Sequence, residues 1–102
     1  MEEVKIEGLV DGRLKINLSG DIDLGNAESF YQTVTNAYKV TPAGITFDCA
    51  NLGFIDSTTL GTFVKILKAL KLDGFDMKLV NLQPKIKKLF LICSLDSIME
   101  IE

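Results

Sequence analysis

The sequence predicts a single α/β domain over residues 1–102, with a mixed, mostly parallel open sheet, an N-terminal β-hairpin and three to four helices packed on it. Two periodicities support this prediction. Segments with apolar residues at every second position alternate along the chain with segments in which apolar residues recur every three or four positions. A length of 102 residues also fits one domain.

The first two strands are predicted to form an antiparallel hairpin. Val4, Ile6 and Leu9 begin one alternating segment. The pair Asp11-Gly12 follows, and this dipeptide is a strong indicator of a two-residue hairpin turn. A second alternating segment comes directly after the turn and indicates a half-buried strand, with apolar positions Leu14, Ile16 and Leu18.

A helix is predicted to follow the turn Gly20-Asp21-Ile22-Asp23, with Asn26 as its N-cap. Thr41-Pro42 should end this helix, because the residue before proline avoids the α region. Its apolar positions fall three and four residues apart and form one stripe: Ala27, Phe30, Tyr31, Val34, Ala37 and Tyr38.

The central stretch, residues 53–61, is predicted to connect an apolar strand that leads into it over residues 44–52 to a second helix at about residues 58–72, through a turn at Asp56 and Ser57. Asp56 and Ser57 should lie at the N-terminus of this helix, because their side-chain oxygens suit an N-cap. Ligands and partners usually bind at this edge of an open α/β sheet. The apolar face of the helix comprises Leu60, Phe63, Val64, Ile66, Leu67 and Leu70, and the opposite face comprises Ser57, Gly61, Lys65 and Lys68.

Gly61 allows two interpretations. Helical side chains lean toward the N-terminus, so a larger residue at position 61 would cover the surface over Ser57, and glycine leaves that hydroxyl open. Alternatively, Gly61 permits close packing of another helix.

The C-terminal part is predicted to contain a strand around Met77 and Leu79, extending to Leu82, and a third helix that starts with Pro84 in its first turn. A short strand at residues 98–101 closes the chain. The inner stripe of the third helix comprises Ile86, Leu89, Phe90 and Cys93. Leu91 and Ile92 project away from this stripe and could form an exposed contact, so the chain is expected to be a monomer or a weak homodimer.

Composition excludes several functions. The net charge of −3 disfavours a nucleic-acid partner, and no apolar run approaches the roughly 20 residues of a membrane span, so no direct membrane insertion is expected. Cys49 and Cys93 are predicted to be buried thiols in a reducing cytoplasm. The chain has no histidine, which excludes a Ser-His-Asp hydrolase and removes the commonest metal ligand. No catalytic residue, metal or cofactor is predicted.

Three motifs, taken in order, resemble those of the anti-sigma-factor antagonists, a family built on the STAS domain. Residues 20–23, Gly-Asp-Ile-Asp, are similar to the family's Gly-Glu-Leu-Asp turn. Residues 54–61, Phe-Ile-Asp-Ser-Thr-Thr-Leu-Gly, are similar to its Asp-Ser-Ser-Gly-Leu-Gly loop. Residues 84–90, Pro-Lys-Ile-Lys-Lys-Leu-Phe, are similar to its Pro-x-Val-x-x-Leu-Phe helix. The resemblance covers nearly the whole chain.

The resemblance implies a bacterial phosphoprotein that regulates transcription and is not an enzyme. In that family the serine after the aspartate is phosphorylated by an anti-sigma factor that is also a serine kinase. The unphosphorylated form binds the anti-sigma factor and frees sigma, and a phosphatase reverses the switch. Ser57 is then the phosphorylation site, and the expected partner-binding residues are Asp23, Asp56, Thr58, Thr59, Gly61 and Lys65.

Two departures from the family pattern are expected to matter. Thr59 replaces the family's glycine. It lies one turn before Phe63, at the edge of the buried face, and is expected to add bulk beside the loop. Many relatives continue into a further helix beyond the position of Glu102, so a surface covered there is expected to be open here.

Other interpretations remain open at this point. Ser57 could be only a helix cap, and Asp56 could be an acid or base, although a lone carboxylate is thin support for catalysis. Asp48 follows Phe47 on a strand, as in a phospho-aspartate receiver, but the acidic cluster that a receiver needs is not evident. The domain could instead be a subunit of a transporter or a stress-sensing complex. A small nucleotide-handling enzyme is less favoured, because the chain lacks a P-loop and a Gly-x-Gly-x-x-Gly motif.

Overall fold

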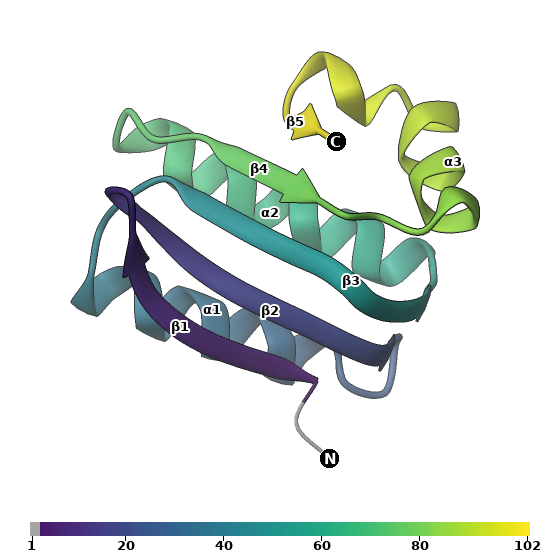
Figure 1. Cartoon of the computed structure of the whole chain (residues 1–102), viewed down its shortest axis with the longest axis horizontal. Helices are drawn as coiled ribbons and strands as arrows, with labels where there is room; N and C mark the ends of the chain where they lie inside the picture. Colours follow the sequence, from purple (N-terminus) through teal and green to yellow (C-terminus); the bar gives the residue numbers. More distant parts are fainter. Residues whose placement is uncertain (1–2) are drawn as a thin grey trace.

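A computed structural model describes residues 3–102, which form one five-stranded sheet in the order β1-β2-β3-β4-β5 (Figure 1). β1 and β2 are antiparallel, and the remaining neighbours are parallel. This architecture confirms the predicted fold class. The elements are β1 (Val4–Val10), β2 (Arg13–Ile22), α1 (Ala27–Val40), β3 (Ile45–Ile55), α2 (Ser57–Leu72), β4 (Met77–Val80), α3 (Pro84–Ile92), the 3-10 turn η1 (Leu95–Ser97) and β5 (Glu100–Ile101).

The hairpin forms where the sequence predicts it. Asp11 and Gly12 have φ values of 53° and 81°, the left-handed conformation that a two-residue turn requires to match the twist of the flanking strands. The pairing of β1 with β2 shifts register between Ile6 and Gly8, which marks a β-bulge. Gly8 has a φ of 96°, which glycine adopts without strain.

The helices α1 and α2 cover one face of the sheet, and the other face is open (Figure 1). Side chains of alternate strand residues therefore enter the core, as Leu14, Ile16 and Leu18 of β2 do. Phe63 of α2 is at the centre of this core. Its ring makes edge-to-face contacts, at centroid distances of 5.1–5.5 Å, with Phe30, Phe47 and Phe90.

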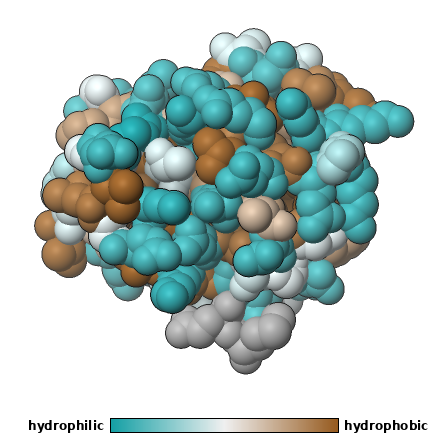
Figure 2. Space-filling view, viewed as in Figure 1, coloured by the Kyte–Doolittle hydropathy of each residue, from teal (hydrophilic) through white to brown (hydrophobic). Residues whose placement is uncertain are grey.

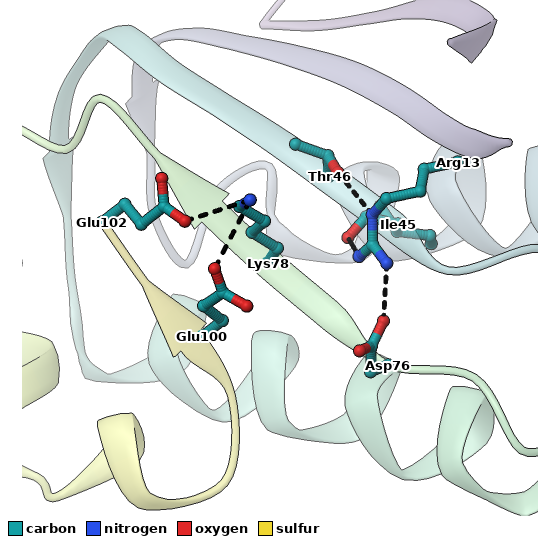
Figure 3. A network of polar contacts seen from close by, with 7 residues as sticks. All are labelled: Arg13, Ile45, Thr46, Asp76, Lys78, Glu100 and Glu102. Atoms are coloured by element: carbon teal, nitrogen blue, oxygen red, sulfur yellow. Dashed lines mark hydrogen bonds and ion pairs between the residues drawn. The ribbon is translucent and has the colours of Figure 1, made fainter. Parts of the chain in front are cut away.

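The open face of the sheet is mostly hydrophilic (Figure 2). Arg13 of β2 donates to the hydroxyl of Thr46, to the carbonyl of Ile45 and to Asp76, the last at 2.8 Å (Figure 3). A side chain at Gly44 would intrude on this arrangement, because a Cβ there would lie 2.7 Å from Nη1 of Arg13. Farther along the sheet, Lys78 of β4 forms ion pairs with Glu100 and Glu102 (Figure 3). These contacts tie β2 to β3 and β4 to the C-terminal strand.

The C-terminal part differs from the prediction in the bounds of three elements. β5 comprises Glu100–Ile101 and does not extend back to Ile98, which follows η1. β4 ends at Val80, so Leu82 lies outside the strand. α3 ends at Ile92, and Cys93 takes the C-cap position, where it leaves the buried stripe and is exposed. The prediction that Cys93 is buried is therefore wrong, whereas Cys49 is buried as predicted. Leu91 and Ile92 are exposed.

Charge is distributed unevenly over the helices. α2 and α3 each carry three lysines and no aspartate or glutamate, although the chain has a net charge of −3. The carboxylates therefore lie mainly on the strands and the connecting segments, and α1 carries only Glu28. None of the helices within residues 3–102 is long and apolar enough to cross a membrane.

Candidate functional site

Two loops lie side by side at the carboxyl ends of β2 and β3. They are brought together because these strands are parallel and, despite two register shifts, stay paired as far as Ile22 and Ile55. The first loop, residues 23–26, leads into α1. The second loop is Asp56 alone, and α2 begins directly after it. The site therefore lies at the sheet edge where open α/β folds usually bind ligands or partners.

Asp56 holds the two loops together and caps α2. Its Oδ1 accepts a hydrogen bond from the Thr59 amide at 3.0 Å, as an N-cap residue does. Its Oδ2 accepts one from the Leu24 amide in the other loop, at 2.9 Å. The Thr59 amide, and then the Leu24 amide, hold the pKa of the Asp56 carboxyl below its ordinary value, because both bonds stabilise the ionised form.

Thr59 is buried and joins α2 to the end of β2 by a hydrogen bond. Its side chain is 0% exposed. Its hydroxyl oxygen lies 2.6 Å from the carbonyl oxygen of Ile22 and 3.0 Å from Oδ1 of Asp56, and its single proton serves these two acceptors. The expectation that Thr59 lies at the edge of the buried face, adds bulk beside the loop and contacts a partner is therefore wrong, because its side chain is fully buried. Its side chain points into the domain because the end of β2 offers it a hydrogen-bond acceptor.

The first loop is held by its own side chains. Oδ1 of Asp23 accepts from the Gly25 amide at 2.9 Å. Oδ1 of Asn26 accepts from the Asp23 amide at 2.8 Å, and its Nδ2 donates to the Asp21 carbonyl at 2.9 Å. Asn26 is the N-cap of α1 by position, as predicted, but its side chain makes no cap bond to the helix. Its amide instead fixes the loop that presents Leu24.

Ser57 and Thr58 are exposed at the start of α2. Within residues 3–102, no group pairs with the Ser57 hydroxyl. Gly61 lies one turn further and is also exposed, and a Cβ added there would meet no atom within 4 Å. The interpretation that Gly61 permits close helix packing is therefore wrong. The glycine leaves the surface above Ser57 open.

Lys65 lies on the same face of α2, two turns beyond Ser57. Eight residues at 1.5 Å each separate the two positions by about 12 Å along the helix axis. Its Nζ lies 4.4 Å from the centroid of the Tyr31 ring, a cation–π contact that joins α2 to α1. Lys65 is thus exposed at the periphery of the site, with its ammonium group placed over α1.

Two exposed apolar residues beside the site were not found by sequence reasoning. Leu24 is 74% exposed in the first loop, and Phe54 is 48% exposed near the end of β3. Phe54 lines a small cavity of about 200 Å³ together with Leu89 of α3. The sequence did hold a signal for Leu24, because it is the one apolar residue in the turn at residues 23–26, whose other residues are aspartate, glycine and asparagine. The side chains of Leu24 and Phe54 offer apolar surface that a bound partner could bury.

Asp48 of β3 lies outside this site, and its carboxylate accepts hydrogen bonds from other groups. Its Oδ1 accepts from the Ala50 amide and from Nδ2 of Asn81, each at 3.1 Å. Across the described residues 3–102, no group of three or more His, Cys, Asp or Glu side chains is placed to hold a metal ion. The acidic cluster of a phospho-aspartate receiver is thus not found in this part of the chain.

The fold and the site define a class: a small α/β domain that presents an open serine at a capped helix N-terminus, next to the loop after its second strand. Residues 3–102 match the family model of the STAS domain. The chain belongs to the STAS domain family.

Within this family the chain is similar to anti-sigma factor antagonists. It is 30% identical over 88 residues to an anti-sigma-B factor antagonist of Bacillus subtilis, covering 86% of this chain and 80% of the relative. A crystal structure of a putative anti-sigma factor antagonist from Thermotoga maritima superposes with a TM-score of 0.84 at 26% identity, covering 96% of this chain and 82% of that one. Unphosphorylated SpoIIAA, an anti-sigma factor antagonist, has a TM-score of 0.82 at 21% identity, over 97% and 87% of the two chains, which shows a common fold.

Proposed function

We propose that this protein is a cytoplasmic anti-sigma factor antagonist that is switched by phosphorylation of Ser57. In its unphosphorylated form it binds an anti-sigma factor that is also a serine kinase, and this binding frees a sigma factor to activate transcription. A phosphatase restores the active form. The protein acts by binding and carries no catalytic residue of its own.

The observation that carries this proposal is the environment of Ser57. The hydroxyl is exposed on the first residue of α2, has no partner in the described chain and lies under the open surface left by Gly61. A kinase can therefore reach it without unfolding the domain. The names of the B. subtilis and T. maritima relatives support the assignment of the partner class.

A phosphate on Ser57 is compatible with the fold. The Thr59 and Leu60 amides are bonded to Asp56, which leaves the Ser57 and Thr58 amides without a described acceptor. The N-terminal end of a helix favours an anion, through these free amides and the helix dipole. The domain should therefore keep its structure when it is phosphorylated.

The switch acts at the interface instead. Phosphate adds about −1.5 to −2 charges at pH 7. This charge appears one residue from the ionised Asp56, whose carboxylate also holds the loop that exposes Leu24. A partner surface fitted to the neutral serine then loses affinity by repulsion and desolvation, and each 1.4 kcal/mol lost weakens binding about tenfold.

The site residues divide into two roles in this proposal. Thr58, Leu24, Asp23, Gly61 and Lys65 lie at or around the exposed surface and contact the partner. Asp56 fixes the two loops relative to each other, and Thr59 fixes α2 against β2 from inside the domain. Substitutions at the contact residues should change the affinity for the partner, whereas a substitution at Thr59 should first change the stability of the domain.

The test is a binding titration against the candidate anti-sigma factor kinase of the same organism, with ATP analogue present. Wild type and Ser57→Ala should bind, Ser57→Asp should bind at least tenfold more weakly, and only wild type should accept phosphate from the kinase with ATP. Ser29→Asp is the matched control, because Ser29 is also exposed in the first turn of a helix, α1. Equal affinity for wild type and Ser57→Asp, or phosphate transfer to Ser57→Ala, would contradict the proposal.

A further inference from the structure

The outer edge of β1 has unpaired backbone groups. β1 is first in the strand order, so among residues 3–102 no other strand pairs with this edge (Figure 1). The Ser19 amide donates to the Glu3 carbonyl at 2.9 Å, which makes these two residues a hydrogen-bonded pair of the antiparallel ladder. Such pairs alternate with non-bonded ones. The amide and carbonyl groups of Val4 and Ile6 therefore point outward, away from β2.

The same edge exposes apolar side chains. Ile6 is 38% exposed, Leu9 is 59% exposed and Val10 is 45% exposed. Ile6 and Leu9 are paired with core residues of β2, so their side chains point to the helix side of the sheet but extend beyond the cover of α1. The opposite edge differs: β5 has two residues and is flanked by the ion pairs of Lys78. A long apolar edge is a favourable site for pairing with another strand.

The charges on β1 are complementary to those of a second copy. Lys5 is paired with Asn17, and Glu7 accepts a hydrogen bond from the side chain of Asn17, so both charges lie on the open face of the sheet. If two β1 strands run antiparallel about a two-fold axis at Ile6, Lys5 of each copy lies opposite Glu7 of the other. An axis at Lys5 would instead place two lysines opposite each other, which is unfavourable.

We propose that β1 pairs with β1 of a second copy of this chain, antiparallel about a two-fold axis at Ile6, to form one sheet that continues across a homodimer. The outward amide and carbonyl of Ile6 bond to those of Ile6 in the second copy. Two ion pairs between Lys5 and Glu7 flank this central pair. The Ile6 side chains of the two copies pack against each other on the helix side.

The bulge sets the extent of this interface. The left-handed Gly8 interrupts the regular strand, so the shared ladder extends from Val4 to Gly8 and the dimer is weak and reversible. The pairing uses both β1 edges, so it closes at two copies and does not propagate. β3, which leads to Ser57, lies two strands away, so the dimer leaves both Ser57 sites accessible and is independent of the function proposed for them.

The test is sedimentation equilibrium over a wide concentration range. Wild type should show a reversible monomer–dimer equilibrium. Lys5→Glu and Glu7→Lys should each raise the dissociation constant about tenfold, which corresponds to about 1.4 kcal/mol. The double swap Lys5→Glu/Glu7→Lys should restore the wild-type constant, because it recreates both ion pairs with the charges exchanged. Lys39→Glu, on the exposed surface of α1, is the control and should leave the constant unchanged.

A further variant, Ile6→Pro, tests whether loss of the dimer could result from loss of the fold. The Ile6 amide points away from β2, so Ile6→Pro removes the central dimer bond and spares the ladder within the chain. This variant should remain folded by circular dichroism and should sediment as a monomer. Three results would each overturn the proposal. Wild type could stay monomeric at all concentrations, or the double swap could have a dissociation constant no lower than those of the single variants. The Ile6→Pro variant could also be folded and still dimerise.

Discussion

The carboxylate of Asp56 and the amide of Leu24 are joined by a 2.9 Å hydrogen bond between residues 32 positions apart in the sequence. The other oxygen of the same carboxylate caps α2. One side chain thus fixes both the start of the helix that carries Ser57 and the loop that presents an exposed leucine. The relative position of these two exposed groups is therefore held by one side chain.

Replacing Asp56 by asparagine should make the stability of the domain less dependent on pH. Because the folded state lowers the pKa of Asp56, its ionised form contributes stability at neutral pH, and this contribution is lost as the pH falls through the folded pKa. Wild type should be more stable than Asp56→Asn at pH 7, and the difference should shrink in acid. Urea unfolding at several pH values measures this. Asp96→Asn, an exposed carboxylate on η1, is the control; a pH-independent difference for Asp56→Asn would contradict the prediction.

Thr59→Val should destabilise the domain by about 1–3 kcal/mol, because it leaves the buried carbonyl of Ile22 without its hydroxyl partner. Valine keeps the shape of threonine, so the loss reports the hydrogen bond rather than a cavity. Thr59→Ser keeps the hydroxyl and should cost less. Chemical denaturation of both variants measures the two free energies of unfolding, and a valine variant as stable as the serine variant would show that the bond to Ile22 is dispensable.

Gly61→Ala should stabilise the domain by about 0.5–1 kcal/mol and weaken partner binding. Alanine is the better helix former, and its methyl group would meet no atom within 4 Å. The same methyl group covers part of the surface above Ser57. The melting temperature should therefore rise in thermal unfolding, while the affinity for the partner should fall in a binding titration. Gly44→Ala is the contrasting variant: its Cβ would approach Nη1 of Arg13 to 2.7 Å and should lower stability. A Gly61→Ala variant with unchanged affinity would remove Gly61 from the interface.

Phosphorylation of Ser57 should leave the backbone in place. Amide resonances of the purified phosphoprotein are expected to shift at the start of α2 and in the loop at Leu24, which shares Asp56 with it. The Ser57→Asp variant should show a weaker form of the same pattern. Shifts spread through the strands of the sheet would indicate a rearrangement and would exclude a switch that acts only by charge at the surface.

The two cysteines should differ strongly in reactivity. Burial, and then the charge of Asp48, raise the pKa of Cys49 to about 12, whereas Cys93 is exposed at the end of α3. A thiol reagent at pH 8 should label one thiol quickly and the second only after unfolding, and Cys93→Ser should abolish the fast phase. Rapid labelling of both thiols in the native protein would contradict the burial of Cys49.

Most of the fold could be predicted because its signals are local. Asp11-Gly12 specifies its own turn geometry, and strands of alternating apolar residues such as β2 show their buried face directly. The start of α2 was predictable for the same reason, since the Asp56 side chain caps the helix by bonding to an amide only three residues away in sequence.

The details that sequence reasoning missed depend on distant contacts. Helical periodicity placed Thr59 at the edge of the buried face, but its full burial arises from the carbonyl of Ile22, which the parallel pairing of β2 and β3 brings alongside. Leu24 became part of the site only through its bond to Asp56. Cys93 continued an apolar stripe in the sequence, yet the helix ended one residue before it.

The lysines of α2 and α3 make these two helices basic, although the chain as a whole has a net charge of −3. An acidic partner attracts these helices, so the chain should approach it with α2, which carries Ser57, turned toward it before the surfaces touch. Such orientation raises the association rate constant and is screened by salt. The protein can therefore have a fast encounter at low ionic strength even though its overall charge is negative.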